Sequence, residues 1–141
     1  MEVNKGADVM TSDQETGSEA PSRILLIEDN EANRSLLEDY LIYQGYSVLA
    51  LGVGIGFDRA LETFQPQVVL LDLRLPDIDG CEILEQMQRH SEWCRVPVIV
   101  VSARAFMTDQ QNALSLGARR YLVKPIRLAE LLQAIQAELI E

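Results

Sequence analysis

Five apolar runs alternate with amphipathic segments after residue 22, and this alternation limits the fold more than any other feature. The runs cover residues 23–28, 46–50, 67–72, 97–102 and 120–124. Runs that are apolar at nearly every position are typical of strands buried on both faces of a parallel sheet. Five strand–helix units therefore predict an α/β fold with helices on both faces of the sheet.

The segments between the runs have helical periodicity. Asn30 can cap a helix whose Leu36, Leu37, Tyr40 and Leu41 share one face, and Gly45 can end that helix. Further helices are expected over 55–64, 80–90 and 108–116, and from residue 128 onward. Right-handed crossovers then favour a doubly wound, five-stranded parallel sheet with the flavodoxin-like order 2-1-3-4-5.

The composition and charge of the chain limit its domain organisation and its partners. Residues 1–22 contain five acidic residues, one lysine and few large apolar groups, which predicts a disordered acidic tail or linker before a domain at 23–141. The formal net charge of −10 argues against a nucleic-acid-binding surface. The absence of a long apolar run or a signal peptide predicts a cytoplasmic protein without membrane contact.

The polar residues of interest lie where the apolar runs end. The first run ends in Glu28 and Asp29, the third in Asp72, the fourth in Ser102 and the fifth in Lys124. In doubly wound sheets, the functional crevice lies outside the carboxyl ends of the strands. We therefore expect three carboxylates, a hydroxyl and an ammonium to converge there.

The charges of this group indicate what it binds. Three carboxylates carry −3 and Lys124 restores +1, so one divalent cation neutralises the site. Oxygen donors select Mg²⁺, or Mn²⁺, over zinc. Such a cation commonly bridges carboxylates to phosphate oxygens. Asp72 could then attack phosphorus as a nucleophile, with Ser102 and Lys124 binding the transferred oxygens.

Four segments carry a resemblance to a known family. They are residues 27–30 (IEDN), 71–80 (LDLRLPDIDG), 101–103 (VSA) and 121–125 (YLVKP). In this order and at these spacings, the chain from about residue 23 onward resembles a receiver domain of two-component response regulators, of the single-domain chemotaxis-regulator type. The resemblance implies that Asp72 is the phosphoacceptor. It also implies that Glu28, Asp29, Asp72 and the main-chain carbonyl of Arg74 bind Mg²⁺.

The same resemblance assigns roles on the last two strands. Ser102 and Ala103 would bind the phosphoryl group together with Lys124, while Ser102 and Tyr121 would form a switch pair. The bond between Lys124 and Pro125 would be cis. Phosphorylation would remodel the outer face made by the helix 108–116, the strand 120–124 and the last helix. Output would pass through that face to a downstream protein, and two copies could pair through it as a homodimer.

The phosphodonor implied is a sensor histidine kinase or a histidine phosphotransfer protein. The chain would not be an enzyme beyond catalysing its own phosphotransfer and slow self-dephosphorylation. Arg74 and Arg104 lie two residues after Asp72 and Ser102, at positions that flank the path of the hydrolytic water in this family. We expect them to slow self-hydrolysis.

Other functions explain the sequence less well. A haloacid-dehalogenase phosphatase also uses an Asp nucleophile, but its general-acid Asp would fall at Arg74. A degenerate receiver that only binds proteins would not need every chemical residue. The glycines at 52, 54 and 56 do not match a dinucleotide fingerprint, because their spacing is one residue short and they follow the second strand. A free-standing regulator and a receiver segment of a hybrid kinase both remain open.

Overall fold

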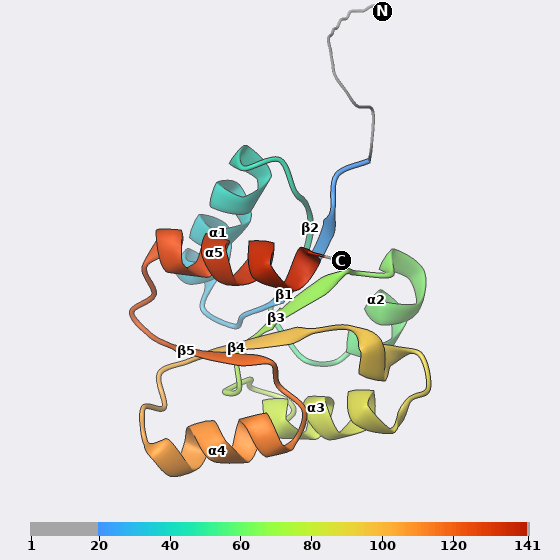
Figure 1. The fold of residues 1–141 in the computed structure, drawn as a ribbon, viewed down its shortest axis with the longest axis vertical. Coiled ribbons are helices and arrows are strands. Elements are labelled where there is room, and N and C mark those ends of the chain that lie inside the picture. Colours follow the sequence, from blue (N-terminus) through green and yellow to red (C-terminus); the bar gives the residue numbers. More distant parts are fainter. Residues whose placement is uncertain (1–19, 141) are drawn as a thin grey trace, which may run out of the picture.

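The computed structural model describes residues 20–140 (Figure 1). The expected acidic tail over 1–22 therefore lies almost wholly outside the described residues, as does residue 141. Eleven elements follow in strict alternation apart from one short 3₁₀ helix. They are β1 (Arg23–Ile27), α1 (Glu31–Tyr43), β2 (Ser47–Leu51), α2 (Phe57–Phe64), β3 (Val68–Leu71), α3 (Gly80–Arg89), η1 (Trp93–Arg95), β4 (Val98–Ser102), α4 (Met107–Ser115), β5 (Arg120–Val123) and α5 (Leu128–Leu139).

The five strands form one parallel sheet in the order β2-β1-β3-β4-β5, which confirms the predicted topology. Ile27, the last residue of β1, pairs with Leu51 of β2 and with Leu71 of β3. These three strands therefore end at the same edge of the sheet. Residues that follow Ile27 and Leu71 in the chain are brought together there.

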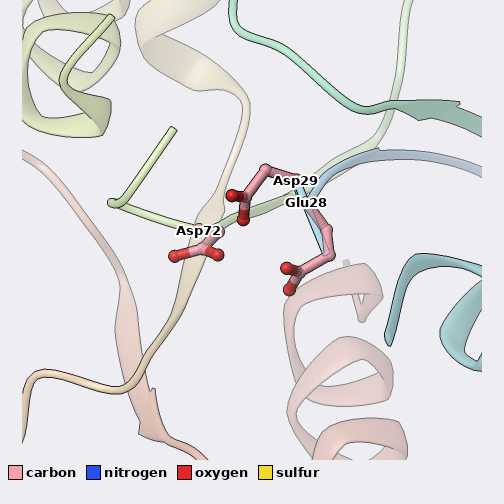
Figure 2. Close-up of side chains that lie close together, drawn as sticks. All are labelled: Glu28, Asp29 and Asp72. Atoms are coloured by element: carbon pink, nitrogen blue, oxygen red, sulfur yellow. The ribbon is translucent and has the colours of Figure 1, made fainter. Parts of the chain in front are cut away.

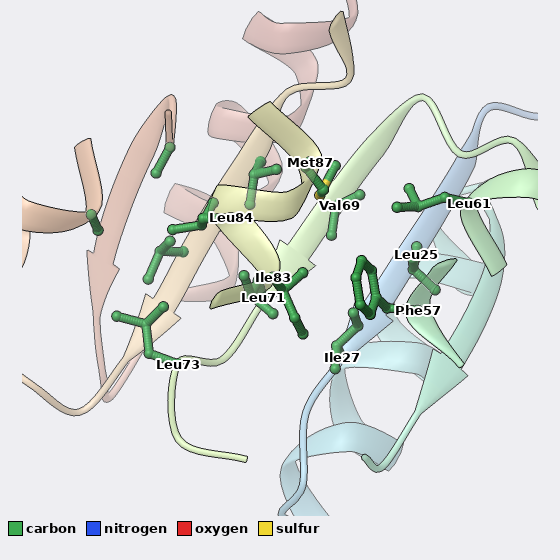
Figure 3. Close-up of a cluster of buried hydrophobic side chains, with 14 of the residues drawn as sticks. Leu25, Ile27, Phe57, Leu61, Val69, Leu71, Leu73, Ile83, Leu84 and Met87 are labelled. Atoms are coloured by element: carbon green, nitrogen blue, oxygen red, sulfur yellow. The ribbon is translucent and has the colours of Figure 1, made fainter. Parts of the chain in front are cut away.

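Helices cover both faces of the sheet. α1 and α5 pack on one face, while α2, α3 and α4 lie on the other (Figure 1). Alternate residues of each strand enter the two cores: Ile24 and Leu26 face α1 and α5, whereas Leu25 and Ile27 face the other layer (Figure 3). Full burial of each such side chain contributes about 2 kcal/mol, so the strands are held from both sides.

The start of α1 follows the predicted capping, but one side chain does not face the core. The Asn30 side chain accepts a hydrogen bond of 2.9 Å from the main-chain nitrogen of Asn33, so Asn30 caps the helix as expected. Leu37 and Leu41 are buried, one helical turn apart. Leu36 belongs to the apolar face that the sequence predicts, but it is 55% exposed and lies outside the buried strip. Leu37 and Leu41 already occupy the strip facing the sheet, and Leu36 is rotated about 100° away.

Two other segments differ from the sequence prediction. Helix α2 begins at Phe57 rather than at residue 55, because Gly56 at its N-cap has φ +96°, a left-handed conformation that glycine adopts without strain. The 3₁₀ helix at Trp93–Arg95 was not predicted. Trp93 stacks on His90 at a centroid distance of 3.8 Å and meets the edge of Phe57. This aromatic contact joins the end of α3 to α2.

Candidate functional site

Three carboxylates converge at the carboxyl edge of the sheet. Glu28 and Asp29 follow β1, and Asp72 follows β3 (Figure 2). One carboxylate oxygen from each residue lies within 4.8 Å of the other two. Glu28 and Asp72 are only 1% and 5% exposed, whereas Asp29 is open to solvent. The site is therefore a cluster of negative charge whose inner part is shielded from water.

Lys124 bridges the two buried carboxylates from the end of β5. Its Nζ atom lies 2.8 Å from Oε1 of Glu28 and 3.1 Å from Oδ2 of Asp72. Lys124 also keeps its main chain at this edge, since its amide donates to the carbonyl of Ser102 at 2.8 Å. One ammonium thus balances part of the charge of three carboxylates drawn from two other strands.

The second carboxylate oxygen of Glu28 and of Asp72 accepts a hydrogen bond from a main-chain amide. The amide of Asn30 donates to Oε2 of Glu28 at 3.0 Å, and the amide of Arg74 donates to Oδ1 of Asp72 at 3.0 Å. These bonds fix the rotamers of both carboxylates. Glu28 Oε1 is buried and, despite its ion pair with Lys124, has no partner of good hydrogen-bond geometry among the described residues.

Burial and charge act on the two ionisable partners in opposite ways. Burial raises the pKa of Glu28 above its ordinary 4.5, and the contacts of its carboxylate with the Lys124 ammonium and the Asn30 amide only partly offset this. Burial alone would lower the pKa of Lys124, but its close contact with the Glu28 carboxylate and the charge of Asp72 outweigh burial and raise it. Lys124 therefore keeps its proton and its positive charge. The charge of the buried Glu28 carboxylate is only partly compensated by its neighbours.

These features suit a small divalent cation. The donors are all carboxylate oxygens, one of them buried without a hydrogen bond, and the formal charge of the three acids with Lys124 is −2. Mg²⁺ and Mn²⁺ prefer such oxygen ligands. The residues present fit the ion that the sequence predicted.

Ser102 and Tyr121 are linked through the main chain of Arg104. Ser102 is fully buried at the end of β4, and its Oγ accepts a hydrogen bond from the Arg104 amide at 3.1 Å. The hydroxyl of Tyr121, half-buried on β5, donates to the Arg104 carbonyl at 2.8 Å. Ala103 lies between these contacts and is exposed. The peptide bond between Lys124 and Pro125 is cis.

Comparison with known proteins decides the family. Residues 24–136 match the family described as the response regulator receiver domain. The chain belongs to this family.

Curated relatives agree with the assignment. This receiver domain is 37% identical over 114 residues to the transcriptional regulatory protein KdpE of Mycobacterium tuberculosis, covering 81% of this chain but 49% of KdpE. It is 30% identical to the polar-differentiation response regulator DivK of Brucella anthropi, covering 84% of this chain and 97% of DivK. The chain thus spans about half of KdpE but nearly the whole of DivK.

Solved structures are similar as well. The receiver domain of the sensor histidine kinase PA1611 from Pseudomonas aeruginosa is 36% identical, with a TM-score of 0.77. The alignment covers 84% of this chain and 97% of that one, and that structure has a magnesium ion coordinated in its active-site cleft. Among residues 20–140 of the present domain, no helix is both long enough and apolar enough to cross a bilayer.

Arg74 and Arg104 of the receiver domain line one shallow depression between the segment after β3 and the loop before α4. The depression has a volume of about 350 Å³ and is also lined by Pro76 and Asp79. Arg74 is exposed and Arg104 is half-buried. The two arginines that the sequence paired as rate-modulating residues thus lie on one surface, and their effect on hydrolysis stays a prediction.

Two residues at the site were not singled out from the sequence. Arg34 of α1 donates from Nη1 to the carbonyls of Glu28 and Asp29, at 2.9 and 3.3 Å. Asp77 accepts hydrogen bonds from the amides of Gly54 and Ile55 in a different loop. No local pattern signals such contacts, because their partners depend on how the loops meet in three dimensions.

Proposed function

We propose that this receiver domain accepts a phosphoryl group on Asp72 in a two-component phosphorelay. The observation that carries the proposal is the convergence of Glu28, Asp29 and Asp72 with Lys124 bridging the two buried acids. Asp72 is held in place by the Arg74 amide on Oδ1 and by Lys124 on Oδ2, and its carboxylate lies close to that of Asp29 (Figure 2). An anchored carboxylate beside a cation site is suited to nucleophilic attack on phosphorus.

Mg²⁺, or Mn²⁺ in its place, would be held by Glu28, Asp29, Asp72 and the main-chain carbonyl of Arg74. When bound, the cation would neutralise charge on the phosphoryl oxygens and on the acidic cluster. The magnesium coordinated in the receiver domain of PA1611 supports this choice.

The transfer step conserves atoms and electrons. One carboxylate oxygen of Asp72 forms a bond to phosphorus, and the bond from phosphorus to the donor atom breaks, with its electron pair leaving on the donor. The donor is the phosphorylated imidazole of a sensor histidine kinase or a histidine phosphotransfer protein. Lys124, the Ser102 hydroxyl and the main chain at Ala103 would bind the phosphoryl oxygens. The chain catalyses this transfer and its own slow dephosphorylation, and turns over no other substrate.

The same network would transmit the state of Asp72. A phosphoryl group on Asp72 would draw the Ser102 hydroxyl toward it and away from the Arg104 amide, which now donates to Ser102 Oγ. Because Tyr121 bonds to the Arg104 carbonyl, displacement of this loop changes the position of the Tyr121 ring. The surface of α4, β5 and α5 would respond as a two-state element.

That surface is the expected output face. Its exposed apolar side chains are Phe106 and Met107 at the start of α4, Leu114 near its end, and Val123 at the end of β5. A downstream protein or a second copy of the chain would bind there. The relatives include DivK, of which the alignment covers 97%, and the receiver domain of a sensor histidine kinase, so a free-standing regulator and a kinase segment are both represented.

The test is phosphoryl uptake from a small donor. The purified domain is incubated with acetyl phosphate and Mg²⁺. The phosphorylated fraction is then measured from its slower migration in a phosphate-affinity gel. Uptake should occur in the parent and in Asp58→Asn, an exposed acid of α2. It should be lost in Asp72→Asn and when the cation is chelated. Uptake by Asp72→Asn at the parental rate would contradict the proposal.

A further inference from the structure

The loop between β2 and α2, residues 52–56, lies beside the acidic site but supplies none of its ligands. Its sequence has glycine at positions 52, 54 and 56. Gly56 adopts a positive φ, whereas the other two glycines meet side chains from other segments of the chain. The loop contacts Arg34 of α1 on one side and the segment after β3, which carries Asp72 and Arg74, on the other.

Gly52 contacts Arg34. A methyl group placed on Gly52 would lie 2.8 Å from Nη1 of Arg34. The same Nη1 atom holds the carbonyls of Glu28 and Asp29. The guanidinium is thus positioned between the 52–56 loop and the main chain of the two acids that follow β1.

Gly54 contacts the segment after β3. A methyl group on Gly54 would clash with Ile78, and the Gly54 amide donates to Oδ1 of Asp77 at 2.9 Å. The amide of Ile55 donates to Oδ2 of Asp77 at 2.7 Å. Two successive amides thus form an anion-binding nest for one carboxylate. The pKa of Asp77 is lowered, chiefly by the hydrogen bond from the Gly54 amide. This carboxylate therefore remains charged at neutral pH.

We propose that the 52–56 loop is a brace that positions the metal ligands, with Arg34 and Asp77 as its two positioning residues. Through Arg34 the brace fixes the main chain of Glu28 and Asp29. Through Asp77 it fixes the segment that contains the Arg74 carbonyl. This inference rests on the proposed metal site.

A brace is needed at this site because the carboxylates of Glu28, Asp29 and Asp72 repel one another. Without support, the exposed Asp29 and the segment after Asp72 would relax apart before a cation arrives. Holding the ligands at their binding distance in advance reduces the ordering cost of binding. Loss of groups that orient metal ligands typically weakens metal binding by about 10- to 100-fold.

The first test uses the metal-free protein. Amide hydrogen exchange is measured for the parent, Asp77→Asn and Asp79→Asn. The Asp77→Asn variant should exchange faster at Gly54 and Ile55, since an amide side chain offers one acceptor oxygen instead of two. Asp79→Asn removes the same charge from the same segment but keeps the bond that Asp79 accepts from Cys81, and it should match the parent. Parental protection of Gly54 and Ile55 in Asp77→Asn would overturn the brace.

The second test is Mg²⁺ affinity, by calorimetry under conditions where each variant is fully folded by circular dichroism. Arg34→Ala should bind Mg²⁺ about tenfold more weakly. If Arg34 acted only through its charge, its removal from beside three carboxylates would strengthen binding instead. Asp77→Asn should also weaken binding about tenfold, and Asp79→Asn should weaken it much less. Arg59→Ala, at an exposed position on α2, serves as the control for Arg34.

The outcomes separate the two proposals. If the parent itself does not bind Mg²⁺, or if Asp29→Asn binds as the parent does, the proposed metal site is wrong. If the parent binds and Asp29→Asn weakens binding, the metal site stands. In that case, parental or tighter binding by Arg34→Ala, or equal binding by Asp77→Asn and Asp79→Asn, overturns the brace alone.

Discussion

The hydroxyl of Tyr121 donates a 2.8 Å hydrogen bond to the main-chain carbonyl of Arg104. The amide of the same residue donates to Ser102 Oγ at the end of β4. The aromatic ring of β5 and the buried hydroxyl of β4 are therefore connected through one residue of the loop before α4. Any change at Ser102 alters the loop that Tyr121 holds.

Removal of the Tyr121 hydroxyl should measure the strength of this connection. Tyr121→Phe should lower the free energy of unfolding by about 1 kcal/mol, since it leaves the Arg104 carbonyl without this donor. Urea denaturation of the unphosphorylated domain is the measurement. Tyr43→Phe is the matched control, because Tyr43 is 85% exposed and should unfold as the parent does. Equal stability of both variants would show that the hydrogen bond contributes little.

Asp29→Asn should separate fold stability from metal binding. Loss of one negative charge from the cluster should stabilise the metal-free domain, by less than about 1 kcal/mol because Asp29 is exposed. The same change should weaken Mg²⁺ binding about tenfold, since a charged ligand is lost. Thermal melts with and without Mg²⁺ measure both effects. A fall in metal-free stability would contradict the role assigned to charge repulsion.

Stability without metal should depend on pH through Glu28. Burial raises the pKa of Glu28 in the folded state above its ordinary 4.5. A carboxyl whose pKa is higher in the folded state than in the unfolded state stabilises the fold fully at a pH below its unfolded-state pKa. This stabilisation is lost as the pH rises through its folded-state pKa. Glu28→Gln should therefore gain stability relative to the parent as pH rises above about 4.5. Urea denaturation across this range without Mg²⁺ is the test, and a difference that stays constant with pH would contradict it.

Arg104 should slow hydrolysis of the acyl phosphate. Arg104 lines the same depression as Arg74, two residues after Asp72, whereas its bonds to Ser102 and Tyr121 use only the main chain. Arg104→Ala should keep those bonds but leave the phosphoryl group less shielded. Dephosphorylation should become about 3- to 10-fold faster, a change of about 1 kcal/mol in the barrier. Arg89→Ala, an exposed position on α3, is the control. An unchanged decay rate in Arg104→Ala would exclude shielding.

The fold was accessible from sequence because strands buried on both faces have a distinctive pattern. Residues 24–27 and 68–71 are apolar at every position, and each alternates between two cores. That pattern, with helical periodicity between the strands, determines a parallel doubly wound sheet and hence the edge where Glu28 and Asp72 meet. The site residues could be listed because strand ends in such a sheet share one edge.

Side-chain partners across loops were not accessible in the same way. Asp77 is 23 residues from Gly54 and is indistinguishable in sequence from an ordinary turn aspartate. Leu36 satisfies a helical apolar pattern, yet Leu37 and Leu41 already fill the core strip, and Leu36 instead lines a groove of about 410 Å³ beside Pro125. The sequence around Trp93 likewise gives no sign that its ring packs against Phe57 and His90.

The central claim is that the phosphoryl group resides on Asp72, and mapping the modified residue tests it most directly. The domain is phosphorylated with acetyl phosphate and Mg²⁺ and then treated with borohydride, which reduces an aspartyl phosphate to homoserine. Peptide mass spectrometry should find homoserine at residue 72 alone, and none in the Asp72→Asn variant. Homoserine at residue 29 or another acid, with residue 72 unmodified, would contradict the account.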